Sequence, residues 1–432
     1  MSDDQYKLQK ILDIASHYGK MFEVSYGCDK TKIIVNGSKL DQQFFSDMKP
    51  WMMNNQIIDV VLNNEHLGQI ISNYDEFQKN VDQNIAKARK SLFSLLGPTL
   101  GQNCEISPVS KLHILKTYVL PILKNGLSTF PLRPNIIKSL DIFHRKVLKS
   151  CLKLSVTAKS CSLYFLTGQT PMTVQLHYDI FNLFHIIWSN PQTKIYSLIK
   201  YILENSCDNS NTWSAHLRNL SRMYNMKDPK ELISYPAPPK EVFKKHVSVV
   251  LTSYHEKEQR EQCIQSESMK YFNVNLFGLS GKPHPAISDI YKSQEVQNMR
   301  HHIKLLVGNY LTNEKRARDS GGNPNCVICQ SNSLETYCHF LVECSALEEP
   351  RNNMLPVLIN FCHSIGFSFI EEILKNNEIL CQFILDPSSM NLQNRININD
   401  PNLTEVFRIC RNYCYSLHTL RMKKMKEATT HN

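Results

Sequence analysis

Four potential metal ligands, Cys326, Cys329, His339 and Cys344, constrain the fold of this chain more than any other feature of its sequence. Their spacing is C-x2-C-x9-H-x4-C. The first two can lie on one tight turn, and His339 and Cys344 are about one helical turn apart, so all four can face one ion. Three thiolates and one imidazole form a closed tetrahedral set, which is typical of structural rather than catalytic zinc. The sequence therefore predicts a structural zinc site, with the neighbouring Cys338 as an alternative ligand.

The remaining cysteines favour a reducing environment. The chain has 14 cysteines, spread along its whole length. Its first residues lack the apolar run of a secretory signal, and no stretch approaches the roughly 18 apolar residues of a transmembrane helix. We therefore expect buried thiols and metal ligands rather than disulfide bonds, with Cys410 and Cys414 in the core. The expected location is intracellular, in the cytoplasm, the nucleus or both, without membrane contact.

Length and periodicity predict an α+β fold that is mainly helical. A chain of 432 residues is expected to form about two to four domains, and its low glycine count of 14 favours helices over an all-β fold. Residues 1–74 combine a helix with short strands, and 75–204 are helical. A linker and helical connection follow at 205–293, and 294–432 contain the predicted zinc site at 326–344.

Apolar periodicity places the individual elements. Strands are expected at 22–24, 32–35, 57–61 and 67–71, with a hairpin turn at Asn36-Gly37. Gly97-Pro98 is expected to stop a helix that starts near Asp75, and Pro121 to kink a helix that starts near Val109. Further helices are expected at 4–18, 135–154, 240–261 and 294–318.

The chain has a net charge of +10 and a sequence pI of about 8.8, which favours a polyanionic partner such as nucleic acid. Two groups of cations stand out. One lies on the helices of the second unit, and the other directly precedes the cysteine cluster; they are Lys87, Lys90, Arg145, Lys149 and Lys153, and Lys315, Arg316 and Arg318. The alternative is that these residues form ordinary solvated helix faces.

Other candidates for chemistry are weaker. Asp3-Asp4 is a carboxylate pair at the start of a helix, where acidic residues favourably meet the helix dipole. His301 and His302 are adjacent, so they cannot face one ion from a helix, and they are expected on a solvated basic face. The aromatic residues Phe181, Phe184 and Trp188 are expected in the core. No glycine-rich phosphate loop or Ser/His/Asp order is evident.

Several segments, in order along the chain, resemble the reverse transcriptases of non-LTR (LINE-type) retrotransposons. LQKILDIASHYGKMFEVSYGCDKTKIIVNGSK (8–39) resembles the segment after the catalytic hairpin, with Lys30 and Lys32 in its Lys-Thr-Lys signature. HLGQIIS (66–72) resembles the primer grip, here His66, Leu67 and Gly68. The segments that resemble the thumb helices and the C-terminal region of animal elements are 85–96, 115–132, 305–317, 326–347 and 381–388.

This resemblance implies an incomplete palm at 1–74, a thumb at 75–204 and a C-terminal region with a CCHC zinc site. It implies that RNA or an RNA–DNA hybrid binds to the basic thumb and to the zinc region. The family's Tyr/Phe-Ala-Asp-Asp motif, whose aspartates hold catalytic magnesium, does not occur in this sequence. We therefore assign no catalytic residue and expect no polymerisation by this chain alone, with magnesium expected only for the complete polymerase. A separate upstream palm chain is one expected partner. The alternative is a co-opted, zinc-stabilised interaction module without a nucleic-acid role.

Overall fold

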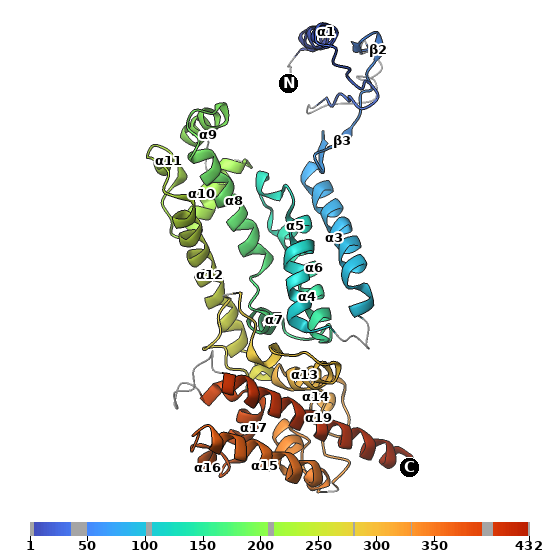
Figure 1. The fold of residues 1–432 in the computed structure, drawn as a ribbon, viewed down its shortest axis with the longest axis vertical. Coiled ribbons are helices and arrows are strands. Elements are labelled where there is room, and N and C mark those ends of the chain that lie inside the picture. The colour runs from blue at the N-terminus through green and yellow to red at the C-terminus, as the bar shows by residue number, and fades with distance from the viewer. Residues whose placement is uncertain are drawn as a thin grey trace.

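The computed structural model describes residues 4–35, 50–100, 106–205, 211–279, 281–329, 331–390 and 401–430. Within these residues the chain is mainly helical and has two two-stranded sheets, which confirms the predicted class. Figure 1 shows an elongated arrangement with the N-terminal elements at one end, long helices in the middle and the C-terminal helices at the other end. No helix in the described part is long and apolar enough to cross a membrane.

The N-terminal elements have a small core of their own. Helix α1 (Gln5–Met21) packs against β1 (Met52–Met53), which pairs with β2 (Gln56–Ile57). Asp4 caps α1, because its carboxylate accepts the Tyr6 N–H at 2.7 Å; Asp3 lies outside the described residues. The buried residues of this core are Leu12, Ile33, Trp51, Met53 and Ile58.

The predicted strands are shorter than expected or absent. Residues 22–24 form no strand, and residues 32–35 contribute only a parallel bridge from Ile33 to Val60. The predicted turn at Asn36-Gly37 lies outside the described residues. In residues 57–61, only Ile57 belongs to a strand, beside the Val60 bridge. Apolar β-branched runs indicated strands here, but few of their backbone groups find a partner strand.

A hairpin links these elements to the long helices. Strands β3 (Asn63–His66) and β4 (Gln69–Ser72) are joined by Leu67 and Gly68, with φ of 50° and 79°. Two consecutive positive φ angles are typical of the type I′ turn that matches strand twist. Asn80 fixes the hairpin to the next helix, because its side chain accepts the Ile70 N–H and donates to the Ile70 carbonyl, both at 2.7 Å.

The helix that follows continues past its predicted end, and the next one changes pitch just before Pro121, where a kink was predicted. Helix α3 (Glu76–Leu100) contains Gly97-Pro98 within its last turn rather than stopping there. Helix α4 (Pro108–Ile114) passes through a π turn, η1 (Leu115–Val119), into α5 (Leu120–Lys124). The π turn precedes Pro121, which lacks the N–H that would continue the helical pattern.

The middle of the molecule is a layer of helices that run close to its long axis (Figure 1). Helix α6 (Pro134–Leu152) agrees closely with its predicted range of 135–154. The other helices here are α7 (Ser160–Thr167), α8 (Met172–Trp188), α9 (Lys194–Asn205), α10 (Trp213–Met223), α11 (Pro229–Leu232) and α12 (Lys240–Ile264).

The predicted basic helix at 294–318 is in fact two helices, α13 (Ser293–Leu306) and α14 (Asn313–Ser320). Gly308 separates them with a φ of 64°, and a Cβ there would lie 2.0 Å from the Ser268 carbonyl oxygen. A left-handed residue in such close contact ends α13 and redirects the chain. Thr312 then starts α14 by accepting the Lys315 N–H at 3.3 Å.

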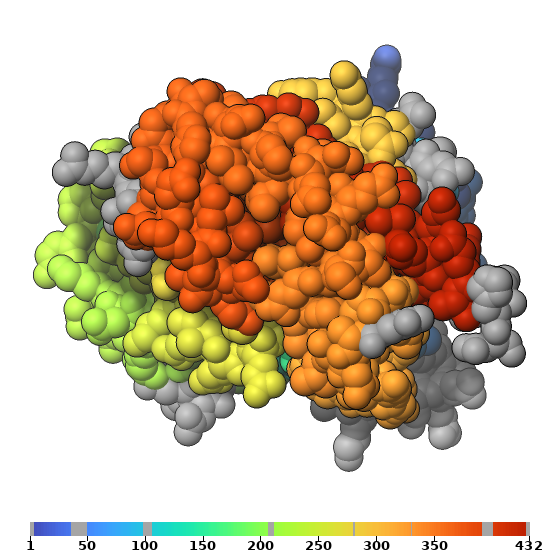
Figure 2. Space-filling view, turned by 90° about the horizontal axis from the view of Figure 1, so that it is seen from below, coloured from blue at the N-terminus to red at the C-terminus, as the bar shows by residue number. Residues whose placement is uncertain are grey.

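The C-terminal region packs around the last helix, α19 (Pro401–Thr430), which contacts α13 and α15 extensively. Figure 2 shows this region covering one end of the molecule, with the end of α19 at the surface beside it. Its other helices are α15 (Glu348–Ser364), α16 (Ile370–Ile373), α17 (Asn377–Leu385) and the short 3-10 turn η7 (Pro387–Met390).

One buried cluster runs from Val81 to Leu417, so the helical middle and the C-terminal region share a continuous core. As predicted, Phe181, Phe184 and Trp188 belong to it, as do Cys410 and Cys414. All five are at most 5 % exposed. The cysteines act here as small apolar side chains.

We predict a pH-dependent contribution to stability from Asp386, which is fully buried and accepts the Asn273 N–H at 2.8 Å and hydrogen bonds from Ser388. Burial raises the pKa of its carboxyl from 3.8 to about 6. The folded chain therefore binds a proton more tightly than the unfolded chain between these values, so stability falls as pH rises from about 4 to about 6. The asparagine variant should flatten this slope in denaturant titrations at each pH, and an unchanged slope would contradict the assignment.

Candidate metal centre

The first two candidate ligands sit in a small hairpin. Asn325 and Leu334 form an antiparallel bridge, and Cys326 N–H donates to the Ser333 carbonyl at 2.8 Å. Just beyond this bridge, Glu335 N–H donates to the Pro324 carbonyl at 3.0 Å. The hairpin thus holds the C-x2-C turn at its end.

The other two ligands are brought together by a π turn, η5 (His339–Glu343). Cys344 N–H donates to the His339 carbonyl at 2.8 Å. This hydrogen bond joins residues five apart, so one turn separates His339 from Cys344 and both side chains face the hairpin. The H-x4-C spacing, predicted to place both ligands on one side, is accommodated by this turn.

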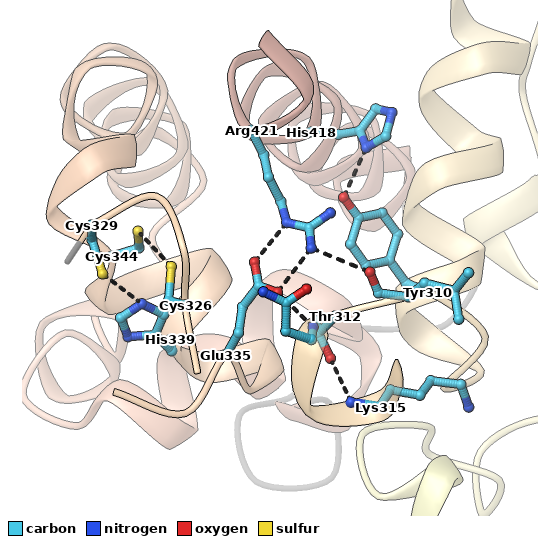
Figure 3. Close-up of polar contacts among 12 residues, drawn as sticks. Tyr310, Thr312, Lys315, Cys326, Cys329, Glu335, His339, Cys344, His418 and Arg421 are labelled. Atoms are coloured by element: carbon cyan, nitrogen blue, oxygen red, sulfur yellow. Dashed lines mark hydrogen bonds and ion pairs between the residues drawn. The ribbon is translucent and has the colours of Figure 1, made fainter. Parts of the chain in front are cut away.

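The four ligand atoms lie within 4.8 Å of one another. The Sγ atoms of Cys326 and Cys344 are 3.9 Å apart, and Cys329 Sγ lies 3.5 Å from His339 Nε2 (Figure 3). Around a tetrahedral zinc with ordinary bond lengths, two sulfurs are separated by about 3.8 Å, and a sulfur and a nitrogen by about 3.6 Å. The observed distances fit one tetrahedral ion.

The surroundings suit a closed, anionic thiolate site. Cys326, His339 and Cys344 are at most 5 % exposed. The hydrogen bond between the two thiols lowers the pKa of Cys326 and raises that of Cys344, so the first of them is the more readily deprotonated. The N–H groups of Ile328 and Cys329 also lower the pKa of Cys326. Metal ligands must be deprotonated, and the surroundings favour that state at Cys326.

Cys338, the predicted alternative ligand, points elsewhere. Its Sγ lies 3.5 Å from Glu343 Oε1, and it hydrogen-bonds with the buried Cys381. The other carboxylate oxygen of Glu343 lies 3.9 Å from His339 Nδ1. At this distance the carboxylate places negative charge beside Nδ1 without a hydrogen bond to it, while Nε2 faces the Cys329 sulfur.

An ion pair that the sequence analysis missed joins this hairpin to the last helix. Arg421 on α19 donates from Nε and Nη2 to both carboxylate oxygens of Glu335, at 2.7 and 2.8 Å (Figure 3). Both side chains are at most 3 % exposed. The same carboxylate accepts the Asn313 N–H of α14 at 2.6 Å. One glutamate therefore joins the ligand hairpin, the basic helix α14 and the C-terminal helix.

Many of the cationic side chains predicted to contact nucleic acid make contacts within the chain. Four of the cations form ion pairs, two donate to backbone carbonyls and one ends a helix. The ion pairs are Lys32–Asp59, Lys87–Glu65, Arg145–Asp141 and Arg318–Glu314; Lys149 donates to Val156, Lys315 donates to Gly308, and Lys153 ends α6.

The remaining predicted cations, Lys30, Lys90 and Arg316, are exposed. They lie on three different elements, namely the turn that follows Gly27, helix α3 and helix α14. The primer-grip-like residues His66, Leu67 and Gly68 form the end of the β3–β4 hairpin, where Leu67 is 87 % exposed.

The prediction that His301 and His302 lie on a solvated face was wrong. His302 is fully buried, and its Nε2 lies 3.2 Å from the Ile384 carbonyl. The ring of His301 stacks on His418 of α19, with centroids 3.8 Å apart. Neither contact has a local signal, because both partners are distant along the chain.

No protein-family model, no curated protein and no solved structure matches this chain.

Proposed function

We propose that this chain binds nucleic acid, either RNA or an RNA–DNA hybrid, and that it is the C-terminal part of a non-LTR retrotransposon reverse transcriptase. The observation that carries the proposal is the closed Cys326/Cys329/His339/Cys344 set directly after the basic helix α14. Zinc in this site has a structural role, since four protein ligands leave no position for substrate.

The metal centre supports binding by fixing the position of α14. Asn313, at the start of this helix, donates its N–H to Glu335 and its side-chain amide to the Asn325 carbonyl at 3.0 Å. Both acceptors belong to the ligand hairpin, so the ion orders the hairpin and the hairpin orders the helix. Arg316 is then presented to solvent on a rigid element. Contacts between such cations and phosphates give affinity and position without sequence choice.

Polymerisation by this chain alone is not part of the proposal, because its sequence lacks the Ala-Asp-Asp motif that would hold magnesium. An upstream palm chain is the proposed partner for that activity. Adding such a chain and measuring RNA-directed DNA synthesis tests this part of the proposal separately from binding.

We predict that the chain binds RNA with an affinity that falls steeply with salt, and that Arg316→Glu weakens binding by about threefold to tenfold and lowers the salt slope by about 1. Fluorescence anisotropy of a labelled RNA over a salt series measures both quantities. Lys257→Glu on α12 is the matched control, because it makes the same charge change at an exposed cation on a different helix. An affinity for RNA that does not change with salt concentration would count against the proposal. So would an equal loss of affinity in Arg316→Glu and Lys257→Glu.

The second candidate is a zinc-stabilised protein-interaction module without a nucleic-acid role. It is favoured by the outer face of α1, where several large apolar side chains are exposed, namely Tyr6, Ile11, Ile14, Tyr18 and Met21. A soluble protein rarely exposes a contiguous apolar stripe without a partner. Absence of RNA binding by the zinc-loaded chain would make this candidate the leading one.

A further inference from the structure

A groove of about 430 Å³ lies between α13 and α19, on a surface to which the sequence analysis assigned no role. Its wall on α13 includes His301, and its wall on α19 includes Tyr415, His418 and Lys423. The groove lies apart from the four metal ligands, none of which lines it. It belongs to the same region, because Arg421, which holds the ligand hairpin, is on the same helix.

Three flat rings gather in this groove. The imidazoles of His301 and His418 are stacked, with centroids 3.8 Å apart and planes 24° apart. The Tyr415 ring lies 5.6 Å from His301 and 6.5 Å from His418. Tyr310 holds His418 in place through a hydrogen bond of 2.8 Å between its hydroxyl and Nδ1 (Figure 3). These contacts fix the positions of the two imidazoles, and the Tyr415 ring beside them is tilted by 48° from His301 and by 40° from His418.

The charge around these rings is positive. Burial, the neighbouring histidine and the cations Lys304 and Arg300 lower the pKa of His301 to about 3. Burial, Arg421, Lys304 and Arg300 lower the pKa of His418 to about 4. The imidazoles are therefore neutral at pH 7, and the nearby cations supply the charge. Lys423 is exposed at the edge of the groove.

We propose that this groove binds a single strand of nucleic acid, with a base stacked on the Tyr415 ring beside the His301/His418 pair and the adjacent phosphates near Lys423. Aromatic platforms flanked by cations suit this ligand, because every base offers a π face and every nucleotide a negative charge. A duplex fits less well, since its bases are already stacked and paired. The inference rests on the proposed function and deepens it by naming single-stranded nucleic acid as the ligand of this region.

The test measures the anisotropy of a labelled single-stranded RNA, the DNA of the same sequence and an RNA duplex, each with the zinc-loaded full chain. Tyr415→Ala should weaken binding of the single strands about tenfold and leave duplex binding nearly unchanged, whereas Tyr415→Phe should bind like the parent chain. Lys423→Glu should also weaken single-strand binding, with Lys257→Glu as the matched charge control. Zinc content and melting temperature establish that each variant is folded.

The outcomes separate this inference from the proposed function. If Tyr415→Ala and Lys423→Glu both bind the single strands as tightly as the parent chain, the groove is not the binding site, although the chain still binds nucleic acid. Absence of binding to all three probes by the parent chain would overturn both. If Tyr415→Ala fails to fold, Lys423→Glu still tests whether the groove binds the strand. Lys423 is exposed on the helix surface, so this substitution should not disturb folding. Tighter binding of RNA than of DNA would support the inference and would indicate that the groove also contacts the 2′-hydroxyl of the strand.

Discussion

Replacing Cys344 with serine is expected to abolish stoichiometric zinc binding and to lower the free energy of unfolding of the C-terminal region by several kcal/mol. Cys344 is fully buried, and its Sγ lies 3.9 Å from that of Cys326. Structural zinc binds to zinc-finger peptides with an apparent free energy of about 10–16 kcal/mol, much of which appears as folding free energy. Zinc per chain by atomic emission and the melting temperature by differential scanning fluorimetry measure the two effects.

Cys338→Ser is the matched control, because Cys338 is equally buried and adjacent to a ligand but faces Glu343 and Cys381. It should keep one zinc per chain. A parent chain without zinc would rule out the metal centre. Zinc loss in Cys338→Ser, with retention in Cys344→Ser, would instead restore Cys338 as the fourth ligand.

The cluster of Cys326, Cys329, His339 and Cys344 could be predicted from sequence because its determinants are local. Both ligand pairs are separated by a few residues, so a hairpin turn and a single helical turn are sufficient to bring each pair together. The long helices could be predicted for the same reason, as α6 shows, since its apolar stripe determines its buried face. The division between α13 and α14 was missed because it depends on Gly308 packing against Ser268, a contact between distant segments.

The roles of charged and polar side chains were harder to predict, because sequence does not reveal their partners. Lys149 was expected to contact phosphate, yet its Nζ donates to the Val156 carbonyl at 2.6 Å. His302 was expected at the surface but is buried beneath α19. Arg421 lies in a basic run that resembles a solvated tail, and only tertiary packing brings it to Glu335. For His302 and Arg421 the deciding contact joins residues far apart in the chain, whereas Lys149 contacts a backbone carbonyl only seven residues away.

Arg421→Ala is expected to destabilise the C-terminal region by about 3–5 kcal/mol, because it leaves the Glu335 carboxylate buried without its partner. The arginine also fills space, since its guanidinium lies 5.5 Å from the centroid of the Tyr310 ring and 5.7 Å from that of Phe340. Chemical denaturation of the zinc-loaded chain measures the loss. Zinc affinity should fall as well, because Glu335 anchors the hairpin that holds Cys326 and Cys329.

Arg408→Ala provides the matched control on the same helix. Arg408 pairs with Glu405, but those side chains are 44 % and 34 % exposed, so its removal should cost about 0–1 kcal/mol. The double variant Arg421→Met with Glu335→Gln should recover part of the loss, because it removes both charges while keeping an acceptor for the Asn313 N–H. Equal costs for Arg421→Ala and Arg408→Ala would show that the buried pair does not hold the hairpin. A double variant that is as unstable as Arg421→Ala would show that packing, rather than the unpaired charge, accounts for the loss.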